Sequence, residues 1–464
     1  MIPLPLTAVA DVVGGSLLAH DTDPAIVTDV TIDSRTAVPG SLFVALPGSH
    51  TDGHAYAGAA CAAGAVGVLA ELDRAAALAG QDGVRGVIAV DDPADALLAL
   101  GVWVRETVDP LVVTVTGSQG KTTTKDLTAA AIATRRRVVA NEGSYNNELG
   151  VPLTCCALQA DTEVLVAEIG ARGSGHIATL AGLLKPDVAV VTMVSPAHIE
   201  LLGSLDAVAE AKSELVESLE ADGVAILNAD DHRVAAMAMR TSAAVMTYGQ
   251  DAAAAWRARD VTLDDSAHAR FTAHGPTDRV GVRLPLPGRH NVGNALAALA
   301  AATACGVDPS SAADGLAGAA VSRWRMELHT RADGVRILND AYNANPVSTA
   351  AALDALAVLP AARRWAVLGF MAELGTLTET AHREVGAHAA AVGIDRLTVV
   401  GDARPIADGA RAAGFAGALD VVADVEEATE LVAAALTEGD AVLVKASRSV
   451  GLERLAGALT EPRP

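Results

Sequence analysis

The sequence predicts an α/β protein of three domains, in which the strands of parallel sheets alternate with helices. The chain has 464 residues, enough for about three domains of ordinary size. Short runs of Val, Ile, Leu and Ala recur along it, and Ala-rich segments separate them. Continuous apolar strands separated by helices are typical of parallel sheets covered on both faces. We place the three domains at residues 1–92, 93–322 and 323–464.

Residues 1–92 are expected to form a small α/β domain. Alternating residues at 30–35 and an apolar run at 42–46 predict strands, and the Pro-Gly pairs near them predict turns. Ser34 and Arg35 lie at the end of the first strand and are candidates for contacts with a phosphate or a uracil edge. A surface salt bridge at the strand end is the alternative.

The second domain, residues 93–322, is expected to contain a doubly wound sheet. Ligands of such sheets bind at the carboxyl ends of the strands. Four apolar runs predict buried strands, at 111–115, 164–169, 188–194 and 224–228. Each run ends near polar residues, which in chain order are the TGSQGKTT loop, Glu168, His198 and the NADD segment at 228–231.

The first apolar run leads into TGSQGKTT, residues 116–123, and then into a helix predicted to start near Lys121. Backbone N–H groups and the helix dipole at such a junction hold phosphate, and glycines let the main chain approach the anion. Lys121 can reach the terminal phosphates, and the Thr122 hydroxyl can bind Mg²⁺. The two glycines are closer together than in the full P-loop pattern. We interpret the loop as a nucleoside-triphosphate site formed by Gly117, Ser118, Gln119, Gly120, Lys121, Thr122 and Thr123.

A carboxylate in the second apolar run, Glu168, indicates a cation. Burying a carboxylate without a partner is costly, so either Mg²⁺ or a structural salt bridge is expected beside it. His198 follows the third run and by itself is an ordinary loop histidine. Together with Glu168 and Thr122, it becomes a candidate contact for a second metal ion.

Lys212 falls on the apolar face of a helix predicted over residues 205–219. Its side chain can extend along that face so that the amine reaches water. Alternatively the amine is buried and has a lowered pKa, and it can then react with CO₂. The resulting carbamate would offer oxygen ligands to a hard metal ion. The helical pattern alone leaves both alternatives open.

Residues 323–464 are expected to form a second, Rossmann-like α/β domain, with Asp340 and Lys445 near the ends of two of its strands. Four strand-like runs alternate with Ala-rich helices. These runs are residues 337–340, 365–370, 397–401 and 441–447.

A helix start in the second domain is a further candidate for nucleotide binding. His290 and Asn291 open an Ala-rich helix there and can hydrogen-bond an adenine edge. Capping of the helix is the alternative explanation for Asn291, because asparagine is a favoured N-cap residue.

Composition excludes several other classes of protein. The net charge of −22 argues against a nucleic-acid surface, since phosphate backbones require a basic face. The four cysteines have no metal-ligand spacing. Cys155 and Cys156 lie in an apolar stretch and are expected to be core residues and not a disulfide, which fits a reducing cytoplasm. No apolar run is long enough for a membrane span, and the N-terminus lacks the basic region of a signal peptide. We expect a cytoplasmic monomer.

Taken together and in order, the motifs resemble those of the Mur ligase family, ATP-dependent amide-forming ligases of peptidoglycan precursor synthesis. They cover nearly the whole chain. The motifs are TGSQGKTT, NEGSYNNELGVPLT (141–154), EIGARGSGHI (168–177), SPAHIELLGSLDAVAEAKSEL (195–215), NADD (228–231) and LPGRHNVGNALAA (286–298). The DSR…PGSLFVALPG…DGH stretch of the first domain resembles the family's UDP-binding domain, which the related folylpolyglutamate synthetases lack.

The resemblance implies roles for individual residues. It implies a carbamate on Lys212 and two Mg²⁺ ions, one held by Thr122 and Glu168 and the other by His198 and the carbamate. Arg325 would reach the γ-phosphate of ATP. Further nucleotide contacts are implied for His290, Asn291, Asn294 and Asp340. Substrate contacts are implied for Ser34, Arg35, Asn146, Asn147, Tyr342, Asn343, Asn345, Lys445 and Ser447.

The third domain carries a hint of the amine substrate. DAYNANP (340–346) and GFMAELG (369–375) are similar to motifs of the branch that adds D-alanyl-D-alanine, although Phe370 stands where Asp is common. The implied reaction joins this dipeptide to UDP-N-acetylmuramoyl-tripeptide through an acyl phosphate. Another Mur-type or folylpolyglutamate-type ligase is one alternative. A regulatory P-loop NTPase is another, but its N-K-x-D motif is absent from the sequence.

Overall fold

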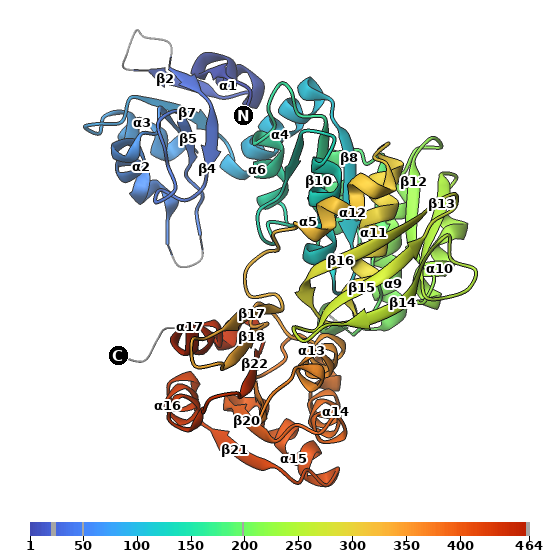
Figure 1. The fold of residues 1–464 in the computed structure, drawn as a ribbon. Coiled ribbons are helices and arrows are strands. Elements are labelled where there is room, and N and C mark those ends of the chain that lie inside the picture. Colours follow the sequence, from blue (N-terminus) through green and yellow to red (C-terminus); the bar gives the residue numbers. More distant parts are fainter. Residues whose placement is uncertain (20–24, 49–50, 197–198, 461–464) are drawn as a thin grey trace. The chain divides into compact units, whose positions relative to one another are not determined.

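The computed structural model describes residues 1–19, 25–48, 51–196 and 199–460. It is α/β throughout, as predicted (Figure 1). Contacts divide the chain into two compact units, which are described separately below. The first comprises Met1–Thr114, Arg136–Gly170 and Thr179–Pro186. The second comprises Val115–Arg135, Ala171–Ala178 and Asp187–Pro464.

A five-stranded sheet forms the core of the first unit's N-terminal part. Its strands, in spatial order, are β2 (Ser16–Ala19), β7 (Gly86–Val90), β6 (Gly67–Glu71), β5 (Ser41–Val44) and β4 (Asp29–Thr31). All neighbours are parallel except β2 and β7. A short antiparallel pair, β1 (Leu4–Pro5) with β3 (Ile26–Val27), accompanies it. The helices of this part are α1 (Leu6–Val13), η1 (Gly53–Tyr56), α2 (Ala57–Ala63) and α3 (Leu72–Ala79).

The strand expected over 30–35 is shorter than predicted, because β4 ends at Thr31. The carboxylate of Asp33 accepts a hydrogen bond from the backbone N–H of Arg35 at 2.9 Å. Such an Asx contact two residues along the chain favours a turn over an extended strand. The polar DSR segment therefore forms the turn that follows β4.

The rest of the first unit contains two parallel strands, β9 (Val138–Ala140) and β10 (Val164–Glu168). Its helices are α4 (Pro93–Val108) and α6 (Gly150–Cys156). Helix α4 has a strong start, because Asp92 accepts from the N–H of Ala94 at 2.7 Å and Pro93 occupies the first turn. Cys155 and Cys156 are buried, in agreement with the prediction that they are core residues.

The nine-stranded sheet contains all four strands predicted for the central domain. Its order is β16-β15-β14-β13-β12-β11-β8-β10-β9. β8 (Leu111–Thr116), β10, β11 (Val188–Val191) and β12 (Val224–Asn228) correspond to the four predicted apolar runs, and β11 ends three residues before its run does. β9 and β13 (Ala244–Gly249) were not predicted. Its helices in the second unit are α5 (Lys121–Ala133), α9 (Leu205–Glu217), α10 (His232–Ala236), α11 (Asn291–Ala304) and α12 (Pro309–Ala317), with short α8 (Ile199–Leu202) and η2 (Met237–Arg240). Helix α7 (His176–Leu184) begins in the second unit and ends in the first.

The three strands beyond β13 were not predicted either. β14 (Trp256–Leu263), β15 (His268–His274) and β16 (Arg279–Pro287) are antiparallel neighbours. In β15 and β16 buried and more exposed residues alternate, which is the pattern of a sheet with one solvated face. This alternation, with many arginines on the solvated face, is the sequence pattern that could have revealed them.

The C-terminal part of the second unit is a six-stranded sheet with helices on both faces (Figure 1). Its strands, in spatial order, are β17 (Glu327–Thr330), β18 (Arg336–Asn339), β22 (Ala441–Lys445), β19 (Arg364–Leu368), β20 (Arg396–Val400) and β21 (Ala418–Val422). Only β17 runs antiparallel to its neighbour. The helices are α13 (Pro346–Val358), α14 (Thr378–Ala391), α15 (Arg404–Ala412), α16 (Val425–Ala435) and α17 (Glu453–Thr460), with short η3 (Gly375–Leu377), η4 (Gly401–Ala403) and η5 (Arg448–Val450).

Successive residues of the C-terminal strands belong to two separate cores. Ile337 packs in the core beneath α16 and α17, whereas Leu338 packs in the core beneath α13, α14 and α15. This alternation is what a doubly wound sheet requires, because successive side chains point to opposite faces. The Rossmann-like prediction for this domain is confirmed.

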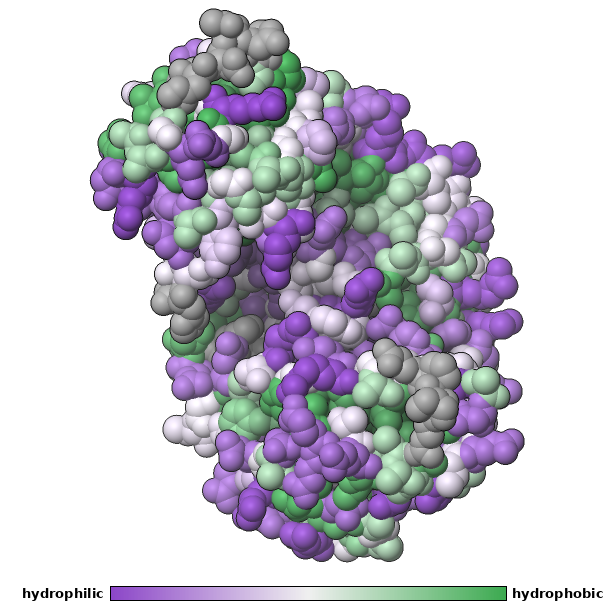
Figure 2. All heavy atoms as spheres, turned by 90° about the vertical axis from the view of Figure 1, so that its left-hand side faces the viewer, coloured by the Kyte–Doolittle hydropathy of each residue, from purple (hydrophilic) through white to green (hydrophobic). Residues whose placement is uncertain are grey.

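The surface and the helices agree with the composition. On the face shown in Figure 2, hydrophilic and apolar side chains are interspersed, as on most folded proteins. None of the helices that the structure describes combines the length and the apolar character needed to cross a bilayer.

We predict that Thr398→Val destabilises the C-terminal sheet. The buried Nε1–H of Trp365 donates to the Thr398 hydroxyl at 2.9 Å. The valine keeps the shape but leaves this N–H without an acceptor, at a cost of about 1–3 kcal/mol in the free energy of unfolding. Urea unfolding followed by circular dichroism measures the loss. Thr398→Ser keeps the hydroxyl and is the control; if it destabilises as much as valine does, the hydrogen bond is not the cause.

Candidate active site

The phosphate loop requires glycine at two positions for steric reasons. Gly117 and Gly120 have φ angles of +146° and +78°, which side chains disfavour. A Cβ on Gly117 would lie 1.8 Å from Thr192 Oγ1, and one on Gly120 would lie 2.7 Å from Asn294 Oδ1. Helix α5 begins at Lys121, as predicted. The loop is therefore a tight strand-to-helix junction.

Hydrogen bonds connect the phosphate loop to the segment that follows β11. The N–H of Ser118 donates to Met193 O at 2.8 Å. The Ser118 hydroxyl donates to Ser195 O at 3.1 Å and accepts from the N–H of Ser195 at 2.9 Å. Thr192 donates to Gln119 O at 2.6 Å. Ser118, predicted as a nucleotide contact, thus uses both its side chain and its N–H to hold the loop in place.

Lys212 is buried within α9, with 2% of its surface exposed. The helix begins where predicted, with Ser204 accepting from the N–H of Ala207 at 3.1 Å. Burial lowers the pKa of Lys212 to about 7, and the charge of Lys121 contributes to the shift. The alternative in which the amine reaches water is therefore wrong. Much of the amine is unprotonated, and so nucleophilic, near neutral pH.

Asparagines of the NEGSYNN segment position Glu168 at the end of β10. Glu168 is buried, its N–H donates to Asn141 Oδ1 at 2.8 Å, and its Oε1 accepts from Asn146 Nδ2 at 2.7 Å. Asn147 instead accepts from the N–H of Gly150 at 2.9 Å at the start of α6. Asn141 was not singled out from the sequence, since an asparagine that supports a carboxylate looks like any loop asparagine.

Of the two other predicted metal contacts, the structure describes Thr122 but not His198. His198 lies outside the described residues, so its metal contact stays a prediction. Thr122 is buried in the first turn of α5, which agrees with a role close to the phosphate loop.

The start of α11 supports the phosphate loop. Asn291 is buried and is the first residue of the helix, not its cap. Its Nδ2 donates to Pro287 O at 2.7 Å, and its Oδ1 accepts from Asn294 at 2.9 Å. Asn294 in turn accepts from the Thr124 hydroxyl at 3.2 Å. The capping explanation for Asn291 is wrong, and His290 is the exposed residue of this group.

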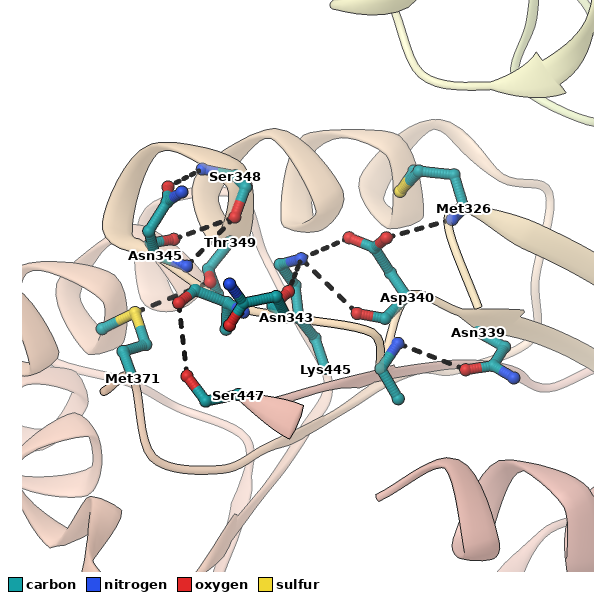
Figure 3. A network of polar contacts seen from close by, with 12 residues as sticks. Met326, Asn339, Asp340, Asn343, Asn345, Ser348, Thr349, Met371, Lys445 and Ser447 are labelled. Carbon is teal, nitrogen blue, oxygen red and sulfur yellow. Dashed lines mark hydrogen bonds and ion pairs between the residues drawn. The ribbon is translucent and has the colours of Figure 1, made fainter. Parts of the chain in front are cut away.

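In the C-terminal domain, Lys445 and Asp340 form a buried ion pair (Figure 3). The other oxygen of Asp340 accepts from the N–H of Met326 at 3.0 Å, and Lys445 also donates to Asn343 O at 3.0 Å. Lys445 therefore joins the end of β22 to the loop after β18. Removing one partner of such a pair would leave an uncompensated buried charge.

Most other candidates of this domain make contacts within it. Asn345 accepts from the N–H of Ser348 at 2.9 Å as the N-cap of α13 (Figure 3). The Ser447 hydroxyl accepts from the N–H of Ala372 at 2.9 Å. The structure brings Arg325 and Tyr342 together, with the guanidinium carbon 4.1 Å from the ring centroid, a cation–π geometry.

A buried histidine packs against the unusual Phe370. The ring of His382 stacks on Phe370 with centroids 5.0 Å apart. Its Nε2 accepts from the N–H of Met371 at 2.9 Å, and its Nδ1 lies 2.6 Å from Thr378 O. Burial lowers the pKa of His382, which favours the neutral ring that these contacts need. Sequence reasoning missed His382, because nothing in its helix marks it as a support for the GFMAELG loop.

After the end of β4 the structure contains a surface salt bridge, and the substrate contacts of Ser34 and Arg35 stay a prediction. Arg35 Nη2 lies 2.6 Å from Asp33 Oδ2, and 86% of the Arg35 side chain is exposed. The hydrogen bonds from Arg35 lower the pKa of Asp33 to about 2. The pair lies on the surface, and Ser34 lies in the turn between the two residues.

Comparison with known proteins identifies the family of this chain. Family models match residues 26–108 (Mur ligase family, catalytic domain), 115–302 (Mur ligase middle domain) and 324–448 (Mur ligase, glutamate ligase domain). The chain belongs to the Mur ligase family. The three matches lie in the chain order of the motifs, so the resemblance inferred from the sequence is confirmed.

Relatives match this Mur ligase over its full length. Proteins named UDP-N-acetylmuramoyl-tripeptide–D-alanyl-D-alanine ligase are 40% identical in Mycobacterium tuberculosis, covering 99% of this chain and 98% of theirs, and 35% identical in Bacillus subtilis, covering 99% of both. MurF from Acinetobacter baumannii has a similar structure, with a TM-score of 0.85, 28% identity and 99% coverage of both chains. MurF ligase from Thermotoga maritima in complex with ADP has a TM-score of 0.76 and 27% identity, and covers 93% of this chain and 97% of that one.

The pKa of Lys212 predicts how its burial affects stability. Below pH about 7 the buried ammonium destabilises the fold. Because the folded pKa lies below the ordinary value of 10.5, this penalty decreases as the pH rises from about 7 towards 10.5. Lys212→Met should therefore be more stable than the wild type at about pH 6, and its advantage should shrink by pH 9. Urea unfolding in CO₂-free buffer measures both values.

The control for this prediction is Lys185→Met, since Lys185 is exposed and pairs with Glu106 at the surface. It should show no such trend between pH 6 and 9. An advantage of Lys212→Met that is the same at every pH would show that the Lys212 amine does not titrate in this range.

Proposed function

We propose that the protein joins D-alanyl-D-alanine to UDP-N-acetylmuramoyl-tripeptide and consumes ATP. The observation that carries the proposal is the full-length identity of 35–40% to ligases named for this reaction. It includes the C-terminal domain, where DAYNANP places Asp340, Asn343 and Asn345 together on the loop before α13. The proposal covers the specific amine as well as the ligase chemistry.

The reaction has two steps. A carboxylate oxygen of the tripeptide attacks the γ-phosphorus of ATP, and the bond from this phosphorus to the bridging oxygen breaks. ADP departs, and the tripeptide becomes an acyl phosphate. The free amine of D-alanyl-D-alanine then attacks the acyl carbon, loses a proton and expels phosphate, which forms the amide. Such phosphoryl transfer depends on positioning and on neutralisation of charge. The phosphate loop, Lys121 and Arg325 would supply both.

The residues present fit Mg²⁺. A hard cation prefers oxygen ligands, and Thr122 and Glu168 offer a hydroxyl and a carboxylate, both buried. They would hold one ion, and His198 with a carbamate on Lys212 would hold a second. Bound Mg²⁺ would neutralise charge on the phosphates.

Lys212 fits carbamate formation on this chain's own chemistry. Its amine nitrogen would bond to the carbon of CO₂ and release one proton, which requires the unprotonated amine. The lowered pKa of about 7 supplies that form near neutral pH. The carbamate would also replace a buried cation near Lys121 by an anion, which removes their repulsion.

The domain roles belong to the same proposal. Residues 1–92 would bind the UDP-linked substrate, 93–322 would bind ATP, and 323–464 would bind the amine substrate. We place the enzyme in the cytoplasm, because ATP is abundant there. We also propose that it is a monomer. Light scattering after gel filtration tests the monomer.

The test of the function is phosphate release from ATP and Mg²⁺ with UDP-N-acetylmuramoyl-tripeptide and one amine at a time. The amines are D-alanyl-D-alanine, D-glutamate, L-alanine and a diamino acid. We expect turnover with D-alanyl-D-alanine only. Turnover with a different amine would keep the ligase chemistry and reject the proposed specificity, whereas release that needs no amine would favour a regulatory NTPase.

The carbamate makes a separate prediction. Stripping CO₂ from the buffer should reduce turnover, and bicarbonate should restore it. Carbon-13 bicarbonate should give a carbamate resonance in the wild type but not in Lys212→Ala, because the variant lacks the amine. A resonance of equal strength in Lys212→Ala would place the carbamate elsewhere.

A further inference from the structure

The NADD segment, residues 228–231, has no role in the function proposed above. It connects the end of β12, at Asn228, to α10, which begins at His232. All three of its polar side chains accept or donate hydrogen bonds. Their partners differ, and this difference indicates what the segment does.

Asn228 holds the first residue after β11. Its Nδ2 donates to Thr192 O at 2.8 Å, and its Oδ1 accepts from the N–H of Asp230 at 3.0 Å. Thr192 in turn donates to Gln119 O, within the phosphate loop. Thr192 therefore connects Asn228 to that loop through two hydrogen bonds.

Asp231 holds the same segment two residues further on. Its Oδ2 accepts from the N–H of Val194 at 2.7 Å. Its Oδ1 caps α10, accepting from the N–H groups of Arg233 at 2.9 Å and Val234 at 3.3 Å. A single carboxylate thus ties the segment after β11 to the start of a helix.

The segment 192–195 is therefore held from two sides. β11 ends at Val191, and the last backbone bond to β8 is the one that the N–H of Thr192 donates to Thr116 O at 3.0 Å. Strand pairing therefore does not determine the position of residues 193–195. Asn228 and Asp231 hold it from one side, and Ser118 binds Ser195 and Met193 from the other. Because displacement of a reacting group by about 1 Å can cost about 100-fold in rate, a segment packed against the phosphate loop has to be fixed.

We propose that Asn228 and Asp231 are positioning residues for phosphoryl transfer. They fix residues 192–195, and through them they fix the phosphate loop, Gly117 to Gly120. Neither side chain is assigned a contact with substrate. The inference rests on the proposed function insofar as that loop binds ATP.

Asp231→Ser is the variant that tests this role. Serine is about as good an N-cap as aspartate, so α10 keeps its cap. The shorter side chain has one oxygen and no second one for the N–H of Val194. We expect the KM for ATP to rise and kcat to fall, with kcat/KM for ATP reduced by about 10- to 100-fold. The KM for D-alanyl-D-alanine should stay within about twofold, because the amine is bound by another domain.

Asp230→Ser is the matched control, since it makes the same exchange at the neighbouring residue. The Asp230 carboxylate accepts from the N–H groups of Gln250 and Asp251, at 2.8 and 2.9 Å, and has no bond to residues 192–195 among the contacts of the described chain. It should lower the melting temperature without changing the KM for ATP. Partial unfolding of either variant would reduce kcat alone.

ADP affinity, measured by calorimetry, separates this inference from the proposed function. A wild type that binds ADP but does not turn over would reject the function and leave the inference to be judged by affinity. Folded Asp231→Ser with wild-type affinity and kcat/KM would overturn the inference. Should this variant not fold, Asn228→Asp replaces it, because the carboxylate keeps the shape but cannot donate to Thr192 O. The same loss is expected there, and wild-type values would again overturn the inference.

Discussion

The structure depends on one steric constraint, the close approach of the phosphate loop to its neighbours. Gly117 leaves no room for a Cβ against Thr192, and Gly120 leaves none against Asn294. The loop can pack this tightly only because both positions are glycines with positive φ. The segment after β11 and the start of α11 are consequently held in hydrogen-bonding contact with the loop. The phosphate loop is thus part of a hydrogen-bonded layer at the ends of the strands.

Two buried lysines show two different ways to tolerate burial. Lys445 pairs with Asp340, which also binds the backbone of Met326. Burial instead lowers the pKa of Lys212 to about 7, in the presence of a second cation, Lys121. The first arrangement braces the C-terminal domain. The second leaves much of the amine unprotonated near neutral pH, which is the physical basis for proposing the carbamate there.

Many side chains that suit a substrate are used to hold loops. Ser118, Asn146 and Asn345 were predicted as contacts with nucleotide or substrate, and they bind a neighbouring segment, Glu168 and a helix N-terminus respectively. The chemistry of a hydroxyl or an amide is the same in both uses. Holding a loop and binding a ligand are also compatible, since the loop carries the groups that meet the ligand. The side chains of the NADD segment act in the same way, but they hold residues 192–195, which in turn contact the phosphate loop.

The sequence by itself determined the α/β class, the four central parallel strands, the start of α5 and the place of Lys212 on the apolar face of its helix. Apolar periodicity and glycine spacing are local properties, and so they can be read without knowing what packs where. Only the tertiary structure decided the partners of Asn141, His382 and Asp231. Each of these depends on segments that are distant in the sequence, and the hydrogen-bonding capacity of a polar side chain does not specify which distant partner it will meet.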